Sequence, residues 1–284
     1  MHYATYTAAR DGLVRDLPDG HEDQRGVSNT STFIWADDEA VLVDTLLTID
    51  ENDRLIEWIR HRDKHLSAVY ITHGHGDHAF GVGQLREAFP DARFLATAAT
   101  IANLRKQAAP AMRDGFWERL FPGKIPVPVL PDPVESTSFP VGRKQAHIVE
   151  TGTTDSPDTT VLWMPHAGVL AAGDVVYNNT YPYLSTTTAQ TRLSWIAALE
   201  RVKALHPTWV VCAHKDATRP DSASDIDATI QYLRDVAEVE REASNAIDFY
   251  HRMLERQPGR RNIGSLWGAA TAILTTSEES PGAR

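Results

Sequence analysis

The sequence predicts an α/β fold in a single domain that covers residues 1–284. Between about residues 40 and 108, short β-branched runs alternate with amphipathic segments, which is typical of a partly parallel sheet covered by helices. A second β-rich section follows at about 141–175, and the chain then becomes mostly helical. The composition is 42% hydrophobic and 23% charged, as in ordinary globular proteins, and layered α/β folds reach this length.

The first part of the chain begins with strands and continues with alternating strands and helices. We expect strands at 3–7, 27–35, 40–44, 68–72 and 93–97. We expect helices at 50–62, directly after residue 78, and at 98–108.

Residues 109–140 interrupt this alternation. The segment holds seven of the sixteen prolines around an aromatic group formed by Phe116, Trp117 and Phe121. Long proline-rich connections in compact domains are often lids or surface wraps. The segment is therefore interpreted as a lid-like insertion with Trp117 or Phe121 facing a substrate. Alternatively, its aromatic residues only pin the loop to the core.

The second part of the chain adds more short strands before the helices. We expect strands at 146–150, 160–164, 169–172 and 209–213, and a helix at 190–206. One long helical stretch at 225–255 and a second at 262–274 complete the chain. These C-terminal helices, 225–274, would cover the core, form a wall of the pocket or form the interface of a homodimer.

The run Ile71–His78 concentrates metal-binding side chains directly after an apolar strand. His73, His75, Asp77 and His78 fall within six residues. Imidazole nitrogen and carboxylate oxygen are zinc ligands, and a catalytic zinc keeps one position open for water. Four ligands from one turn cannot reach a single ion without strain. The pattern therefore predicts two adjacent ions, with His73 and His75 at one and Asp77 and His78 at the other.

The pattern His73-x-His75-x-Asp77-His78 resembles the signature of the metallo-β-lactamase-fold hydrolases. The resemblance implies a four-layer αβ/βα sandwich, to which the C-terminal helices would be an addition. It also implies one or two zinc ions at the edge between the sheets, with iron or manganese as alternatives. Known members hydrolyse β-lactams, lactones, thioesters, phosphodiesters and sulfate esters, so the fold alone does not select a reaction.

The same resemblance implies the remaining ligands. Asp174, after an apolar strand, occupies the place of a carboxylate that bridges two ions, and His214, at the end of the 209–213 strand, that of the last ligand. Asp44 either orients a ligand or caps the turn after its strand. The single cysteine, Cys212, is expected to be a packed core thiol.

The chain departs from the family pattern at Thr153. This residue stands where the resemblance implies a third histidine for the first ion, and threonine is a poor zinc ligand. Glu150, Asp155 or His147 would substitute for it, or the first site is weak or empty, or the change gives that ion an additional open position. Of these alternatives we favour a weakened first site.

Together these features predict a metal-dependent hydrolase that uses a metal-activated water on a small ester, lactone or amide. Asp77 would orient the water or receive its proton. A pocket for an apolar substrate is expected from aromatic residues of the 109–140 segment and of the stretch after Asp174. The residues proposed for it are Trp117, Phe121, Tyr177, Tyr181, Tyr183 and Trp195. Alternative functions are a β-lactamase-like or thioesterase activity, or a non-catalytic metal-binding scaffold with a degenerate first site.

The charge and the termini restrict the partners. A net charge of −10 argues against a nucleic-acid-binding surface and against binding to anionic membranes. A single cysteine allows no intramolecular disulfide, and neither a signal peptide nor an apolar run of membrane-spanning length is visible. We therefore expect a cytoplasmic protein whose partner is a small-molecule substrate.

Overall fold

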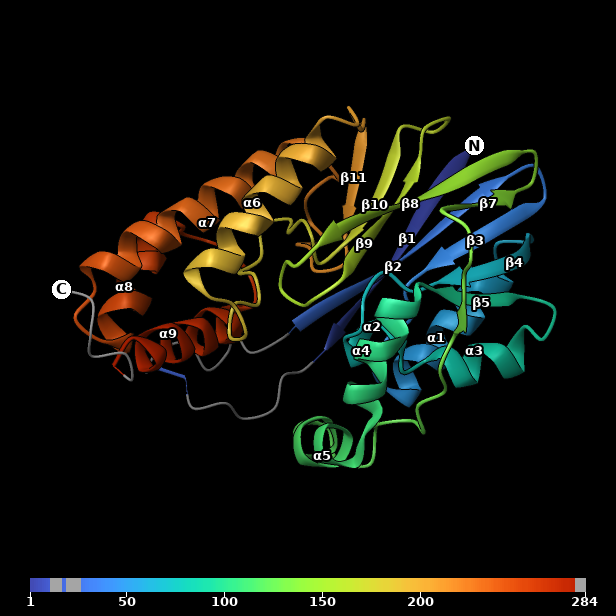
Figure 1. Ribbon diagram of the computed structural model, residues 1–284. Helices are drawn as coiled ribbons and strands as arrows, with labels where there is room; N and C mark the ends of the chain where they lie inside the picture. Colours follow the sequence, from blue (N-terminus) through green and yellow to red (C-terminus); the bar gives the residue numbers. More distant parts are fainter. Residues whose placement is uncertain (11–16, 19–26, 279–284) are drawn as a thin grey trace.

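The computed structural model describes residues 1–10, 17–18 and 27–278 of the chain. Two β-sheets pack face to face, and helices cover the outer face of each sheet (Figure 1). The four-layer α/β sandwich that the sequence predicts is therefore confirmed. In the described residues, no helix is long and apolar enough to cross a membrane.

The first sheet has six strands in the described part of the chain, and their order across the sheet is their order in the sequence. These strands are β1 (His2–Arg10), β2 (Val27–Ala36), β3 (Glu39–Val43), β4 (His65–Tyr70), β5 (Arg93–Ala96) and β6 (Asp132–Pro133). The first three are antiparallel, and β3 to β6 are parallel. The helices between the parallel strands are α1 (Ile49–Arg60), α2 (Gly76–Ala79), α3 (Val82–Ala88) and α4 (Ala98–Ala108).

Local sequence explains where these helices start. Thr48 caps α1: its hydroxyl accepts the Glu51 N–H at 3.3 Å, and the Glu51 carboxylate accepts the Thr48 N–H at 3.0 Å. Thr97 caps α4 through the N–H of Thr100 at 3.1 Å. Each cap satisfies backbone donors that the first helical turn leaves free.

The second sheet has the order β11-β10-β9-β8-β7. Its strands are β7 (Ser138–Val141), β8 (Lys144–Gly152), β9 (Thr159–Met164), β10 (Val169–Gly173) and β11 (Trp209–Cys212). All pairs are antiparallel except β10 and β11. Because β10 and β11 are parallel, both strands end at the same edge of the second sheet.

Strands β6 and β7 were not expected, because they lie at the end of the proline-rich segment. Pro133 lies in β6 and Pro140 in β7, and each of these strands is the edge of its sheet. Edge strands tolerate proline because one side of an edge strand needs no ladder hydrogen bonds. Before them, the same segment forms α5 (Pro110–Met112) and the π-helical turn η2 (Arg113–Glu118).

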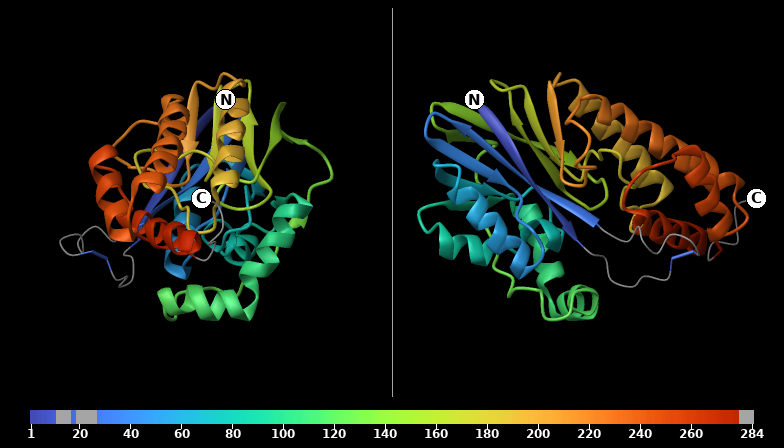
Figure 2. Two further views of the ribbon diagram at one scale, coloured as in Figure 1. Left: turned by 60° about the vertical axis from the view of Figure 1, so that its left-hand side comes forward. Right: turned by 180° about the vertical axis from the view of Figure 1, so that it is seen from behind.

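The C-terminal part forms α6 (Ala189–Lys203), α7 (Ser224–Glu242), α8 (Ala246–Arg256) and α9 (Ile263–Glu278). The single helix expected at 225–255 is wrong, because the chain leaves α7 after Glu242 and starts α8 at a new cap. The Asn245 side chain accepts the N–H of Asp248 at 3.0 Å. Figure 2 shows α6 and α7 against the second sheet, with α8 and α9 at their far end.

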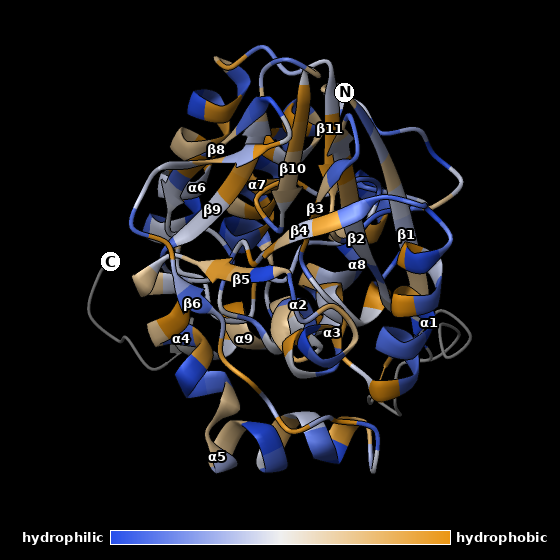
Figure 3. Cartoon of the chain, turned by 90° about the vertical axis from the view of Figure 1, so that its right-hand side faces the viewer, coloured by the Kyte–Doolittle hydropathy of each residue, from blue (hydrophilic) through white to orange (hydrophobic). Residues whose placement is uncertain are grey.

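Three apolar layers hold the four structural layers together. One lies between the sheets and includes Val41, Tyr70 and Leu162, all fully buried. A second layer packs the first sheet against α1, α3 and α4, and a third packs the second sheet against the C-terminal helices. Cys212 is buried in the third layer, as expected for a core thiol. Figure 3 shows hydrophobic residues on the strands and a mixture of both colours on the helices.

Candidate metal centre

The histidine motif forms the turn between β4 and the short helix α2. Gly74 and Gly76 are needed there because neighbouring groups come very close. A Cβ at Gly74 would lie 2.6 Å from the Asn103 Cβ, and one at Gly76 would lie 2.7 Å from the Phe80 ring. Neither glycine has a positive φ. The glycines therefore permit close packing rather than an unusual backbone conformation.

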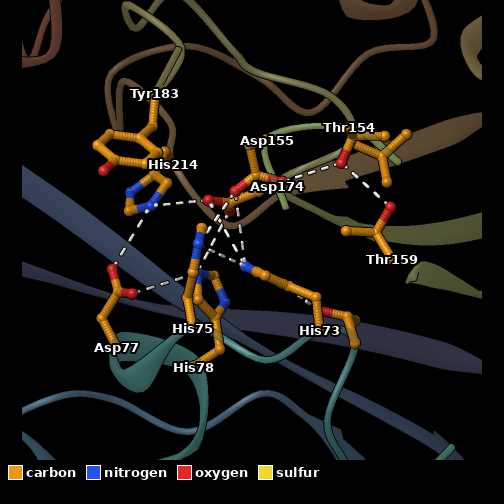
Figure 4. Close-up of polar contacts among 12 residues, drawn as sticks. His73, His75, Asp77, His78, Thr154, Asp155, Thr159, Asp174, Tyr183 and His214 are labelled. Carbon is orange, nitrogen blue, oxygen red and sulfur yellow. Dashed lines mark hydrogen bonds and ion pairs between the residues drawn. The ribbon is translucent and has the colours of Figure 1, made fainter. Parts of the chain in front are cut away.

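The structure brings the expected ligands together at the edge between the two sheets (Figure 4). Residues from the turn after β4 meet residues that follow β8, β10 and β11. They form two groups whose ligand atoms lie within 4.8 Å of one another. The first group is His73, His75, Asp155 and Asp174, and the second is Asp77, His78 and His214.

Asp174 lies between the groups, as a bridging carboxylate would. Its Oδ1 is 3.3 Å from His78 Nε2, and its Oδ2 is 3.3 Å from His214 Nε2. The same Oδ2 is 3.9 Å from His73 Nε2. Two oxygens of one carboxylate thus face both groups, which is the arrangement used in two-metal sites.

Hydrogen bonds fix which nitrogen of His73 faces the cluster. The Thr72 hydroxyl donates to the Asp44 carboxylate at 2.8 Å, and a carboxylate can only accept. Thr72 Oγ1 must therefore accept from His73 Nδ1, which lies 3.1 Å away. We assign the proton of His73 to Nδ1, so that Nε2 points its lone pair into the first group.

The same reasoning applies to the histidines of the second group. His78 Nδ1 lies 3.1 Å from Asp44 Oδ2, and His214 Nδ1 lies 2.6 Å from the carbonyl oxygen of Ser28. Both partners are acceptors, so Nδ1 carries a proton in each ring and Nε2 faces the carboxylates. Asp44 thus orients His78 and, through Thr72, His73, in line with the first of its two predicted roles.

The electrostatics of the centre favour a cation. Burial raises the pKa of Asp77, but the opposing attraction of His78, His214 and Arg10 prevails and lowers it to about 2. Burial likewise acts against ionisation of Asp174, yet His214 and His78 hold its pKa well below its usual value. These ionised carboxylates attract positive charge to the imidazole Nε2 positions.

The histidine pKa values follow from the same charges. Burial lowers the pKa of His78, but Asp174 and Asp77 outweigh burial and raise it well above its usual value. Burial and the neighbouring His78 lower the pKa of His73 to about 4. A neutral His73 is in the form that can ligate a metal.

The donor set fits a divalent ion. Three buried atoms that face the cluster have no hydrogen-bond partner among the described residues, namely His78 Nε2, Asp155 Oδ2 and Asp174 Oδ1. Buried polar atoms normally have partners, because desolvation without one is costly. Imidazole nitrogens together with carboxylate oxygens are ligands for zinc and for related divalent metals.

The departure at Thr153 has a structural counterpart. Thr153 is half-buried and belongs to neither group, whereas Asp155 is buried within the first group. Of the other substitutes considered, Glu150 is exposed, and His147 lies within β8 outside both groups. Of the three substitutes considered, Asp155 is therefore the one that the structure places beside His73 and His75.

A cavity of about 260 Å³ lies over the centre, and His75, Asp77, Asp174 and His214 form part of its lining. Trp117, Phe121, Tyr177 and Tyr183, four of the residues proposed for a substrate pocket, line this cavity as well. Trp117 and Phe121 also belong to the apolar layer under the first sheet. They therefore pin the segment to the core as well as facing the cavity.

Two predicted pocket residues lie elsewhere. The Tyr181 hydroxyl donates to the carbonyl oxygen of Gln257 at 2.8 Å, and its ring packs on Tyr232. The Trp195 indole donates to the carbonyl oxygen of Val175 at 2.8 Å inside the core. Both are bulky buried side chains of the third apolar layer, and their closeness to Asp174 in the sequence does not bring them to the cavity.

The sequence reasoning also missed part of the lining. Arg10 at the end of β1 and Asn262 and Ser265 near the start of α9 face the same cavity. Arg10 is buried, and its Nε donates to Glu51 at 2.9 Å. The sequence around Arg10, at the end of a weakly alternating strand, does not predict that this side chain lines a cavity. Only the folded arrangement reveals it.

Comparisons with known proteins agree with this fold. Solved structures that resemble the chain include a metallo-beta-lactamase from Pontibacter korlensis, with a TM-score of 0.62 and 17% identity over 82% of this chain and 94% of that one. Another is the metallo-beta-lactamase FIM-1 from Pseudomonas aeruginosa in its mono-zinc form, with a TM-score of 0.57 and 16% identity over 82% and 91%. Identities this low show the shared fold alone.

A short sequence match points to a different relative. A hydroxyacylglutathione hydrolase of Parasynechococcus marenigrum (strain WH8102) is 40% identical over 68 residues. The match spans 24% of this chain and only 26% of that relative. A family model described as the metallo-beta-lactamase superfamily matches residues 25–214, which include every side chain of the two metal-binding groups. The chain therefore belongs to the metallo-beta-lactamase superfamily.

Proposed function

We propose that this protein is a metal-dependent hydrolase of small esters, lactones or amides that carry an apolar group. One observation carries the proposal: residues of two groups of ligand atoms line a cavity that apolar side chains also line. Such a site pairs a reactive centre with a surface that can hold the unreactive part of a substrate.

The side chains would hold the metal in two places. His73 and His75 would contribute to one ion and Asp77, His78 and His214 to the other, with Asp174 between them. A bound divalent ion supplies a Lewis acid and lowers the pKa of a water molecule toward neutrality. Zinc is the first candidate for this donor set, with iron or manganese as alternatives.

Asp77 is the proposed catalytic residue because its carboxylate belongs to the second group and also lines the cavity. The Asn29 amide donates to its Oδ2 at 3.3 Å and to its backbone carbonyl at 2.7 Å. Arg10 Nη1 lies 3.8 Å from the same Oδ2. These contacts fix the carboxylate where it can orient an attacking water and receive its proton.

The cavity walls suggest how a substrate would bind. Met112, Phe116, Trp117, Leu120 and Phe121 form an apolar wall. They would pack against the apolar part of the substrate and exclude water from the reacting bond. Other lining residues, namely Tyr183, Thr186, Asn262 and Ser265, offer polar groups for a leaving group or a ring substituent. The volume restricts the bound portion to a small molecule.

Thioester hydrolysis is the second candidate. The partial match to a hydroxyacylglutathione hydrolase favours it, although the match covers only a quarter of each chain. A thioester presents the same electrophilic carbonyl, so the same residues would serve either reaction. A β-lactamase-like activity has weaker support, because the likeness to metallo-beta-lactamase structures shows the fold alone. A non-catalytic metal-binding scaffold is the remaining alternative.

The test is a hydrolysis screen on protein reconstituted with zinc or with manganese. The panel contains p-nitrophenyl esters of increasing acyl length, simple lactones, an amide, a hydroxyacylglutathione thioester and a chromogenic β-lactam. We expect turnover of at least one carbonyl substrate that a chelator abolishes and that Asp77→Asn reduces at least 100-fold. Asp37→Asn, in an exposed turn, is the matched control. Metal-loaded protein that turns over no member of the panel would refute the proposal and leave the scaffold alternative.

A further inference from the structure

We propose that Asp155 is a ligand of the first ion in place of the histidine that Thr153 replaces, and that the resulting site of two imidazoles and two carboxylates shifts metal preference from zinc toward manganese or iron. The inference rests on the proposed metal-dependent function and adds the identity of the ligand and the class of metal.

The position of Asp155 supports ligation. Its carboxylate is completely buried, and its Oδ2 lies 3.1 Å from His75 Nδ1 and 3.8 Å from His73 Nε2. The two histidine atoms are 3.2 Å apart. Ligand bonds of about 2.1 Å place neighbouring ligands of a tetrahedral ion about 3.4 Å apart. The three atoms thus have the spacing of ligands around one ion.

A group of threonines holds Asp155 in this orientation. Thr154 Oγ1 donates to Asp155 Oδ1 at 2.9 Å and lies 3.1 Å from Thr159 Oγ1. Thr159 in turn lies 2.8 Å from the Thr151 hydroxyl and donates to the carbonyl oxygen of Gly152. All three threonines are buried. The network occupies Oδ1 and leaves Oδ2 as the oxygen that faces the histidines.

The free oxygen points to a cation as its partner. Asp155 Oδ2 has no hydrogen-bond partner among the described residues, although it is fully buried. A buried ionised oxygen without a partner is strongly destabilising unless a cation neutralises it. A role limited to orienting His75 is a weaker explanation, because the same oxygen, 3.1 Å from His75 Nδ1, also faces His73 Nε2 at 3.8 Å.

The exchange of an imidazole for a carboxylate changes the chemistry of the site. Three carboxylates, from Asp77, Asp155 and Asp174, would offset all but one of the four positive charges of two divalent ions. A centre with a histidine in place of Asp155 would have two carboxylates, which would leave two of the four positive charges of the ions without an opposite charge. Carboxylate oxygen is also the harder donor and suits manganese better than imidazole does. The zinc preference of the first site should therefore be smaller than that of a site with three histidines.

The experiment compares metal binding by the wild-type protein with that of Asp155→Asn, Asp155→His and Thr154→Val. Asp158→Asn is the matched control, since Asp158 lies in the same loop, is exposed and has a φ of +56° that asparagine also adopts. Metal content after dialysis is measured by mass spectrometry. Affinities for zinc and manganese are measured by competition with a chromophoric chelator, and circular dichroism verifies the fold.

We expect two ions in the wild-type protein and in the control. Asp155→Asn should weaken the first ion about 100-fold while the second is retained, and Thr154→Val should weaken it about 10-fold. Asp155→His should raise the ratio of zinc to manganese affinity at least 10-fold. A folded Asp155→Asn protein that binds both ions with wild-type affinity would overturn the inference, and so would an unchanged affinity ratio in Asp155→His.

The two proposals fail in distinguishable ways. If the wild-type protein binds no divalent ion, the proposed function fails together with this inference. If the wild-type protein binds metal and hydrolyses a substrate while Asp155→Asn keeps both ions, only the assignment of Asp155 fails.

Discussion

Replacing Asp44 by asparagine tests whether a buried carboxylate sets the direction of the metal-binding histidines. Asp44 accepts the Thr72 N–H at 2.8 Å, the Thr72 hydroxyl at 2.8 Å and His78 Nδ1 at 3.1 Å. An asparagine has the same shape but places an NH₂ group opposite at least one of these donors. Its φ of +61° is a conformation that asparagine also adopts, so the backbone adds no strain.

The expected effect has two parts. Loss of a charge-assisted hydrogen bond and a buried donor left without a partner should lower the free energy of unfolding by about 2–3 kcal/mol in the presence of a chelator. If the asparagine NH₂ group faces His78 Nδ1, the proton of this imidazole moves to Nε2, which can then no longer bind a metal. The second ion should in that case bind about 10- to 100-fold more weakly. The first ion should change less, because His73 depends on Asp44 only through Thr72.

The two parts need separate assays. Urea unfolding in the presence of a chelator measures stability without metal, and competition with a chromophoric chelator measures the two metal affinities. Asp37→Asn is the control: Asp37 has a φ of +54° but is exposed, and it pairs with the exposed Arg143 at 3.2 Å. Its substitution should change stability by less than about 0.5 kcal/mol. Wild-type affinity for both ions in Asp44→Asn would refute the proposed control of His78 by Asp44.

Three further predictions follow from neighbouring contacts. The Tyr177 hydroxyl donates to Asp174 Oδ2 at 3.0 Å, so Tyr177→Phe should lower the free energy of unfolding by about 1–2 kcal/mol; unchanged urea denaturation would contradict this. Burial raises the pKa of Asp225 from 3.8 to about 6, against the hydrogen bond from Asn178. The folded state therefore holds this proton more tightly than the unfolded state, and the wild-type protein loses stability as pH rises from about 4 to 6. Asp225→Asn should avoid this loss, so its free energy of unfolding should rise by about 1 kcal/mol relative to that of the wild type between pH 4 and pH 6. This value is reduced because the side chain is partly exposed. A difference in the free energy of unfolding that does not depend on pH would contradict the prediction. Trp117→Ala should lower the free energy of unfolding by about 3 kcal/mol. It should also raise kcat/KM for esters with longer acyl chains relative to shorter ones, since it removes part of the apolar wall. An unchanged order of ester preference would argue against this wall as the site that binds the acyl chain.

The parts that the sequence predicted well depend on local pattern. The strand, turn and helix around His73 follow from an apolar run and the ligand spacing. Asp174 and His214 were expected from the family resemblance, which singled out these residues after short buried strands, and the structure places both beside the histidine turn. The break between α7 and α8 was missed because the apolar periodicity continues across it, and only the cap at Asn245 marks the new start.

The role of Asp155 could not be decided from the sequence for a physical reason. Glu150, Asp155 and His147 all carry groups that bind metals, and all lie within a few residues of Thr153. What separates them is the conformation of the loop between β8 and β9, which depends on hydrogen bonds among buried threonines. The same limit applies to Tyr181 and Tyr183, two neighbouring aromatic residues of which only the second lines the cavity.

The placement of the centre also explains why binding and folding should be linked here. His73 and His78 follow a strand of the first sheet, whereas Asp155, Asp174 and His214 follow strands of the second. The two sheets meet through the apolar layer between them and through a few hydrogen bonds, among them the Thr160 N–H to the Thr72 carbonyl oxygen at 3.0 Å and the Tyr70 hydroxyl with the Thr160 hydroxyl at 2.8 Å. An ion that draws ligands from both sheets therefore connects the two halves of the sandwich at the edge where the cavity opens. Because the ionised carboxylates of Asp77 and Asp174 repel one another, a bound ion that activated water would also stabilise this edge of the cavity.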